Sequence, residues 1–183
     1  LLGTTGEANS FSAGERRAIL ESALAAGIPG DQLIPGTGVN AGPETVELTR
    51  HALSNGVRKV VMLPPSYYKG VSDDGLFASY ARIFETINDD RLRVILYHIP
   101  QVSGVPITHA LIGRLIEAFP DTVIGIKDSA GDLANMQAIA AAHPGFAVLA
   151  GADPLMLPLL KSGGAGCITA TSNLIANSLC TIY

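Results

Sequence analysis

The sequence predicts an α/β fold in which parallel strands alternate with helices and curve toward a barrel. Short, β-branched apolar runs alternate with longer stretches of helical periodicity along the 183 residues. Each apolar run leads directly into Gly, Pro, Thr, Asp or Ser, as expected of loops that gather at one face of a barrel. With 48% hydrophobic and 15% charged residues, the composition is that of a densely packed enzyme and excludes a disordered or fibrous chain.

Seven apolar runs are candidate strands. The first ends at Leu2, just before a glycine, and the others cover residues 33–35, 59–63, 93–97, 123–126, 147–150 and 166–169. Because the strands alternate with helices, we expect parallel pairing. A closed (β/α)8 barrel has one strand more than these seven, and we expect the missing strand to precede Leu1. An open, doubly wound sheet is the competing architecture.

Helical patterns fill the stretches between the candidate strands. Residues 13–26 carry apolar side chains at helical spacing, with Ser12 as the N-cap and Glu15 as its capping-box partner. Further helices are expected at residues 42–55, 72–88, 108–119, 132–142 and 154–161. The regular alternation supports a single barrel-type domain over residues 1–183.

The two ends of the chain suggest an internal piece of a longer protein. Leu1 and Leu2 lead into a glycine-rich turn without a preceding methionine, and the last residues before Tyr183 are apolar. We therefore expect strands 2 to 8 of a barrel, without the first strand-helix unit and the C-terminal helices.

Charge and composition exclude several classes of partner. The net charge of −4 leaves no basic stripe for a nucleic acid. No apolar run approaches the roughly 20 residues that a membrane helix needs. The two cysteines, Cys167 and Cys180, lack metal-ligand spacing, which favours reduced thiols in a cytoplasmic protein. The four histidines are not clustered, so neither a metal nor another cofactor is expected.

Lys127 is the most informative residue, because it closes the apolar run of residues 123–126. Lysine is rarely buried, and the carboxyl end of a parallel strand is where barrels carry their chemistry. Burial favours the uncharged amine, which attacks a carbonyl, so Lys127 is a candidate Schiff-base nucleophile. A solvent-facing lysine, or one paired with Asp128, is the alternative.

Three other loops carry candidate site residues. Tyr97 ends a strand and is either a proton relay or a core tyrosine with its hydroxyl at the rim. Thr4 and Thr5 lie in a glycine-bounded turn whose hydroxyl and N–H groups could hold a carboxylate. Tyr68, next to Tyr67, belongs to a loop that is a lid, a subunit contact or an ordinary surface loop.

Three motifs in order resemble those of the dihydrodipicolinate synthase/N-acetylneuraminate lyase family. They are Gly-Thr-Thr-Gly-Glu at residues 3–7, Tyr-His-Ile-Pro at 97–100 and Gly-Ile-Lys-Asp-Ser at 125–129. The resemblance extends from Gly3 to Asn173. It implies a TIM barrel and a class I aldolase or lyase that handles pyruvate without a metal.

The resemblance also implies roles for individual residues. Lys127 corresponds to the lysine that forms an imine with pyruvate, and Tyr97 to the tyrosine that moves protons. Thr4 and Thr5 correspond to the pair that holds the pyruvate carboxylate, with Thr4 also in the proton relay. Further expected positions are Ile168 and Gly151 as substrate contacts and Tyr68, which in the family enters a neighbouring subunit's site. A homo-oligomer, a dimer or tetramer, is therefore expected.

Val102 departs from the synthases of this family, which usually carry an arginine there for the carboxylate of aspartate semialdehyde. Valine cannot form a bidentate contact with a carboxylate. The pattern favours a Schiff-base lyase or aldolase acting on a keto acid or keto-deoxy sugar acid. Two alternatives stay open: 4-hydroxy-tetrahydrodipicolinate synthase, which condenses pyruvate with aspartate semialdehyde, and a non-catalytic barrel that binds keto acids.

Overall fold

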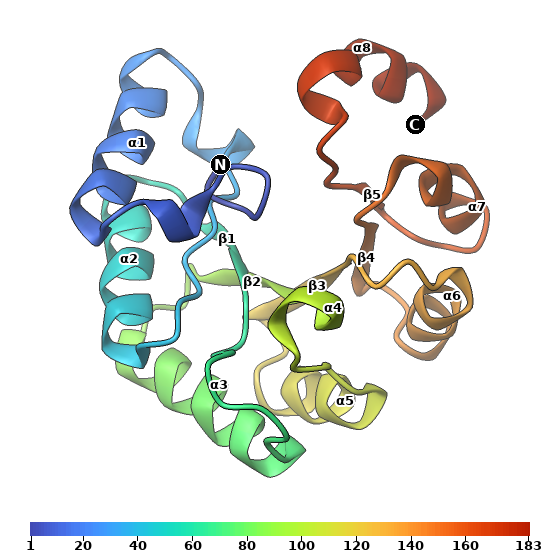
Figure 1. Cartoon of the computed structure of the whole chain (residues 1–183), viewed down its shortest axis with the longest axis horizontal. Coiled ribbons are helices and arrows are strands. Elements are labelled where there is room, and N and C mark those ends of the chain that lie inside the picture. The colour runs from blue at the N-terminus through green and yellow to red at the C-terminus, as the bar shows by residue number, and fades with distance from the viewer.

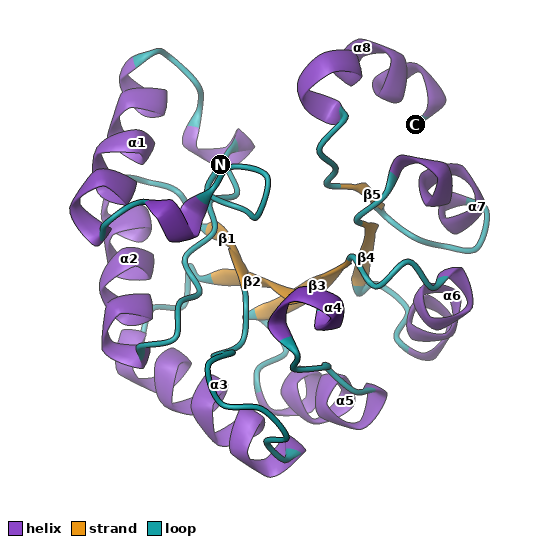
Figure 2. Cartoon of the chain, viewed as in Figure 1, coloured by secondary structure: helices purple, strands orange, loops and turns teal.

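Five parallel strands form one curved sheet at the centre of the molecule (Figure 2). In the computed structural model, which describes residues 1–183, the strands are β1 (Lys59–Met62), β2 (Arg93–His98), β3 (Val123–Asp128), β4 (Ala147–Ala150) and β5 (Gly166–Cys167). Their spatial order is their chain order, and every pair is parallel. A doubly wound sheet would reverse its strand order, so the sequential order excludes that alternative.

Apart from the four-residue α4, the helices follow one another around the outside of the sheet (Figure 1). They are α1 (Ala13–Ala25), α2 (Gly42–Ser54), α3 (Asp73–Ile87), α4 (Pro100–Ser103), α5 (His109–Ala118), α6 (Leu133–Ala142), α7 (Met156–Leu160) and α8 (Ser172–Ile182). Short 3-10 turns cover Ala8–Ser10, Gly30–Gln32 and Asp153–Leu155. The predicted alternation of strands and helices is confirmed.

The two earliest strand candidates do not form regular strands. Leu2 has a φ of 56°, which is outside the extended region. Residues 33–35 form no strand, and only the next residue, Gly36, makes an isolated parallel bridge with Val61. This segment still runs along β1, because the Thr37 N–H donates to the Val61 carbonyl at 3.1 Å. A proline and two glycines within residues 35–38 shorten the ladder, since proline lacks an N–H.

The helix predictions agree with the structure to within a few residues, with three differences. Residues 154–161 divide into the 3-10 turn at Asp153–Leu155 and the short α7. Pro100–Ser103 forms an extra helical turn, α4. Residues 172–182 form α8, a helix that the apolar pattern of the chain end did not reveal.

The two faces of the sheet carry different layers. The outer face, represented by Leu96, Ile126 and Val148, packs with the helices into the main core. The inner face carries a smaller cluster that includes Val61, Ile95 and Tyr97. Alternate residues of each strand therefore point into the ring or out toward the helices.

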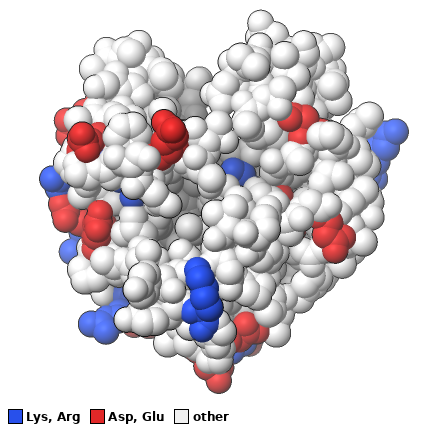
Figure 3. Space-filling view, in the orientation of Figure 1, with Lys and Arg blue, Asp and Glu red and all other residues white.

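The face of the molecule in Figure 3 shows no concentration of one charge. In Figure 3, acidic and basic side chains are scattered over the face in view, with a notch at its upper edge. The first loop and α8 lie on the two sides of the opening in the ring (Figure 1). None of the helices combines the length and apolar character that crossing a bilayer requires.

Leu111→Ala tests the main core. Leu111 of α5 is fully buried, so truncation leaves a cavity and is expected to lower the free energy of unfolding by about 2–5 kcal/mol. Urea denaturation followed by circular dichroism measures the loss. The matched control is Leu174→Ala, because Leu174 is 85% exposed and its truncation should change stability by less than about 0.5 kcal/mol. Equal losses in both variants would contradict the assigned core.

Candidate active site

Lys127 and Tyr97 are direct neighbours on adjacent strands. Lys127 lies near the end of β3 and Tyr97 near the end of β2, and the two residues are paired in the parallel register. Paired residues of a parallel ladder point to the same face, which here is the inside of the ring. The register arises at a bulge, where Val94 pairs with Val123 but Ile95 pairs with Gly125. This one-residue shift brings the lysine beside the tyrosine.

Lys127 is buried and is not part of an ion pair. Its exposed fraction is 9%, and its Nζ lies 4.2 Å from the centre of the Tyr97 ring. None of the four ion pairs of the chain includes it. The carboxylate of the next residue, Asp128, instead accepts hydrogen bonds from Ala130 N and Asn135 Nδ2. The geometry therefore excludes both a solvent-facing lysine and the pairing with Asp128.

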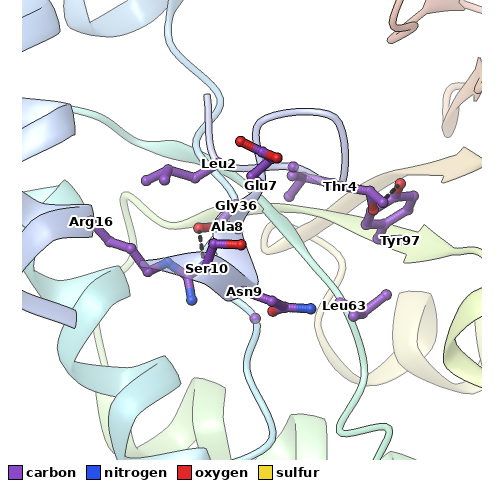
Figure 4. Close-up of a pocket in the computed structure, with 13 residues that line it drawn as sticks. Leu2, Thr4, Glu7, Ala8, Asn9, Ser10, Arg16, Gly36, Leu63 and Tyr97 are labelled. Carbon is purple, nitrogen blue, oxygen red and sulfur yellow. Dashed lines mark hydrogen bonds between the residues drawn. The ribbon is translucent and has the colours of Figure 1, made fainter. Parts of the chain in front are cut away.

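Thr4 completes a hydroxyl pair with Tyr97. Its Oγ1 lies 3.0 Å from the Tyr97 hydroxyl, as the dashed line at the right of Figure 4 shows. Both residues line a cavity of about 250 Å³ beneath the first loop. Thr5 is exposed and does not line this cavity. Tyr97 thus contacts both the Lys127 amine and the Thr4 hydroxyl.

Gly151 and Ile168 occupy the loops that follow β4 and β5. Gly151 N donates to the Asp128 carbonyl at 2.8 Å, and Ile168 N donates to the Ala150 carbonyl at 2.9 Å. A Cβ on Gly151 would stand 2.7 Å from Ser129 Cα, so only glycine allows these two loops to approach. Both residues therefore lie at the strand ends near Lys127, while their substrate contacts stay predictions.

Tyr68 does not reach the Lys127 site within this chain. It is 76% exposed and packs edge-on against Tyr67, with ring centres 5.1 Å apart. Val102, in α4, is 62% exposed. The contact of Tyr68 with a neighbouring subunit is untested and stays a prediction.

Arg16 is a buried cation that the sequence reasoning did not find. It is only 3% exposed, lines the same cavity, and donates from Nη2 to the Gly36 carbonyl at 2.9 Å (Figure 4). Its Nε has no hydrogen-bond partner. Burial lowers the pKa of Arg16, and the negative charge of Glu44 opposes that shift. In sequence it belongs to a polar helical run that is typical of a solvated face.

A second overlooked group joins the loops after β4 and β5. Thr169 Oγ1 donates to Asp153 Oδ1 at 2.6 Å and lies 2.7 Å from Ser172 Oγ. Hydrogen bonds from the Thr169 and Thr171 side chains hold the pKa of Asp153 below its usual range. Asp153 begins the 3-10 turn after β4, whereas Thr169 lies between β5 and α8 and Ser172 begins α8, so only the fold shows that Asp153 meets Thr169.

His98 and Asp128 are paired in register on the outer face, behind Tyr97 and Lys127. The Ile107 N–H donates to His98 Nδ1 at 3.0 Å, which leaves the proton of the neutral ring on Nε2. Burial lowers the pKa of His98; the Asp128 charge raises it, and His109 lowers it further. No three His, Cys, Asp or Glu side chains are grouped so that they could hold a metal ion.

A buried lysine thus stands beside a tyrosine at the carboxyl ends of parallel strands, which is where α/β barrels carry their functional groups. The model of the dihydrodipicolinate synthetase family matches residues 1–183, and the chain belongs to this family. The resemblance that the three motifs indicated is therefore confirmed.

Several relatives illustrate the range of the family. A DapA-like lyase of Chloroflexus aurantiacus is 38% identical over 94% of this chain and 57% of its own length. Dihydrodipicolinate synthase of Agrobacterium tumefaciens has a TM-score of 0.94 at 36% identity, covering all of this chain and 63% of that structure. The 2-keto 3-deoxygluconate aldolase of Picrophilus torridus has a TM-score of 0.84 at 26% identity, over 94% of this chain and 61% of that one. The chain thus spans less than two thirds of these relatives.

His98→Asn tests the buried histidine. An asparagine Oδ1 can replace Nδ1 as the acceptor for Ile107 N, but it cannot take up a proton. Because the folded-state pKa of His98 is lowered, the unfolded chain binds its proton first as the pH falls below about 6.5. The wild type is therefore expected to lose stability relative to the variant between about pH 7 and 5. Urea unfolding across this range measures the difference, and parallel pH curves would contradict a neutral, buried His98.

Proposed function

We propose that this protein is a Schiff-base lyase or aldolase that forms a pyruvate imine on Lys127. The observation that carries the proposal is the buried Lys127 amine, 4.2 Å from the ring centre of Tyr97, whose hydroxyl lies 3.0 Å from Thr4 Oγ1. Family membership supports the same chemistry, because relatives carry lyase, synthase and aldolase names.

The first step joins the lysine to the keto acid. The uncharged Lys127 amine attacks the keto carbon, the keto oxygen leaves as water after two proton transfers, and a protonated imine forms. This imine accepts electrons, so a proton can leave the neighbouring carbon to give an enamine nucleophile. In the reverse direction, the imine accepts the electron pair of a breaking carbon–carbon bond. No metal takes part in this scheme.

Tyr97 moves the protons in this proposal, and Thr4 extends the relay. A tyrosine hydroxyl both donates and accepts, and its neighbour Thr4 is a second hydroxyl within hydrogen-bond distance. Proton transfer by a positioned side chain typically contributes about 10²–10⁴-fold to the rate. The relay therefore explains why a tyrosine occupies this inner-face position.

The pyruvate carboxylate is assigned to the first loop. Thr4 and Thr5 would supply hydroxyl and N–H donors, while Gly151 and the backbone of Ile168 would border the keto acid from the loops after β4 and β5. Fixed donors around a carboxylate orient the imine for proton transfer. Thr5, which is exposed here, has room to meet a ligand.

The second substrate is proposed to be an aldehyde derived from a keto acid or keto-deoxy sugar acid. Val102 offers no cation for the carboxylate of aspartate semialdehyde, and Thr169, Ser172 and Asp153 supply hydroxyl and carboxylate groups in the segments that follow β4 and β5. 4-Hydroxy-tetrahydrodipicolinate synthase is the alternative reaction, because many relatives, including one of Rhodospirillum centenum, carry that name.

We also propose that the protein is a homo-oligomer and lies in the cytoplasm. Tyr67 and Tyr68 expose 74% and 76% of their surface in one loop, and aromatic side chains are enriched in subunit interfaces. Tyr68 would enter the site of a neighbouring copy. Cys167 and Cys180 are both free, as suits a reducing compartment.

Imine trapping on Lys127 tests the function directly. Incubation with pyruvate and borohydride should attach a reduced adduct to Lys127, located by peptide mass spectrometry. Lys127→Met should abolish the adduct, and the exposed Lys161 should stay unlabelled as an internal control. The absence of an adduct on Lys127 in folded wild-type protein would contradict the proposal.

Tyr97→Phe separates imine chemistry from mere binding. Loss of the hydroxyl is expected to lower turnover by about 10²–10⁴-fold, while the Lys127 amine remains in place. Steady-state release of pyruvate from a panel of keto-deoxy sugar acids measures the change. The wild-type protein could form the borohydride-trapped pyruvate adduct and still cleave or condense no member of a broad keto-acid panel. That result would favour the non-catalytic binder.

A further inference from the structure

Asp128 is a fully buried carboxylate directly behind the candidate active site. It follows Lys127 in β3, so its side chain points to the opposite face of the sheet, toward α6. Oδ1 accepts from Ala130 N at 2.8 Å, and Oδ2 accepts from Asn135 Nδ2 at 2.7 Å. Both oxygens face N–H donors, which is the arrangement that an ionised carboxylate satisfies.

The backbone around Asp128 connects three strands at the mouth of the ring. The Asp128 carbonyl accepts from Gly151 N, and Ser129 N donates to the His98 carbonyl, both at 2.8 Å. Gln101 Nε2 donates to the Ser129 carbonyl at 2.5 Å. The residues that immediately follow Lys127 are therefore held by β2, β4 and α4 together.

The Asp128 side chain fixes this segment from the outside. Asn135 lies in the first turn of α6, and its N–H is capped by Asp132 Oδ1 at 3.1 Å. Its amide oxygen lies 2.9 Å from His109 Nε2. Because Asn135 is oriented at both ends, its Nδ2 meets Asp128 in one rotamer, which locks the β3–α6 turn onto the helix.

We propose that Asp128, oriented by Asn135, is a positioning residue that holds Lys127 in the orientation for attack on the keto carbon. This inference rests on the imine function proposed above. Asp128 does not touch the reacting atoms. It acts through the backbone it shares with Lys127, where a shift of about 1 Å can cost on the order of 100-fold in rate.

A swap of the two side chains tests this role. In Asp128→Asn, an amide donor can meet the amide donor of Asn135, so the rate of imine formation should fall about 10- to 100-fold. Asn135→Asp alone sets two carboxylates against each other and should also slow the reaction. In the double variant, the new amide can accept from Ala130 N and donate to the new carboxylate on α6. Imine formation should then recover to within about threefold of wild type.

The readout is the rate of the borohydride-trapped pyruvate adduct on Lys127, measured beside thermal unfolding of each variant. Asp74→Asn is the matched control, because Asp74 is 86% exposed and pairs only with the surface Arg114 at 2.7 Å. Its trapping rate should equal that of wild type. Recovery of the rate in the swap, but not in either single variant, supports positioning.

Failure of the imine function and failure of the positioning role give different results. If wild-type protein forms no adduct, both the imine function and the positioning role are overturned. If wild-type protein is labelled and folded Asp128→Asn is labelled equally fast, the positioning role alone is overturned. Should a single variant not fold, a folded double variant with a rate still about 10-fold or more below wild type would also overturn it.

Discussion

The parallel pairing of β2 with β3 is the interaction on which the rest of the site depends. Its bulge at Ile124 and Gly125 sets which residue of β3 stands opposite Tyr97. A Cβ on Gly125 would lie 2.5 Å from the Ala147 carbonyl, so the close approach of β4 also requires glycine there. A register one residue different would place Asp128 inside the ring and Lys127 among the apolar residues of the outer core.

The site divides the polar groups between two sides of one sheet. The proposed reacting groups lie inside, where the Lys127 amine packs over the Tyr97 ring and where Tyr97 and Thr4 line the cavity beneath the first loop. Supporting groups lie outside, where buried His98 accepts from Ile107 N and buried Asp128 accepts from Asn135 of α6. A buried charge is costly unless its hydrogen bonds are complete, and both oxygens of Asp128 are satisfied. Asp128 and His98 can therefore support the site from the outer face of the sheet, where they do not contact the substrate.

Local patterns predicted most of the helices and the central pair of the site, Lys127 and Tyr97, because caps, periodicity and motifs depend on neighbouring residues. Two of the seven strand candidates failed, since a strand needs a partner as well as an apolar run. α8 was not predicted, although its polar and apolar residues alternate with helical spacing. Arg16 and the Asp128–Asn135 pair gave no signal, because each contact joins different elements. From sequence alone, a polar residue is expected at the solvent-exposed surface, and only the fold shows that it is buried.

By itself, the sequence determined the alternation of strands with helices, the identity of the candidate nucleophile and the family. Those properties follow from local periodicity and from motifs whose residues lie next to one another. Only the tertiary structure decided that Lys127 faces Tyr97 inside the ring while Asp128 faces Asn135 outside it. The physical reason is that side-chain direction depends on register across the sheet, and register is set by contacts between strands far apart in the chain.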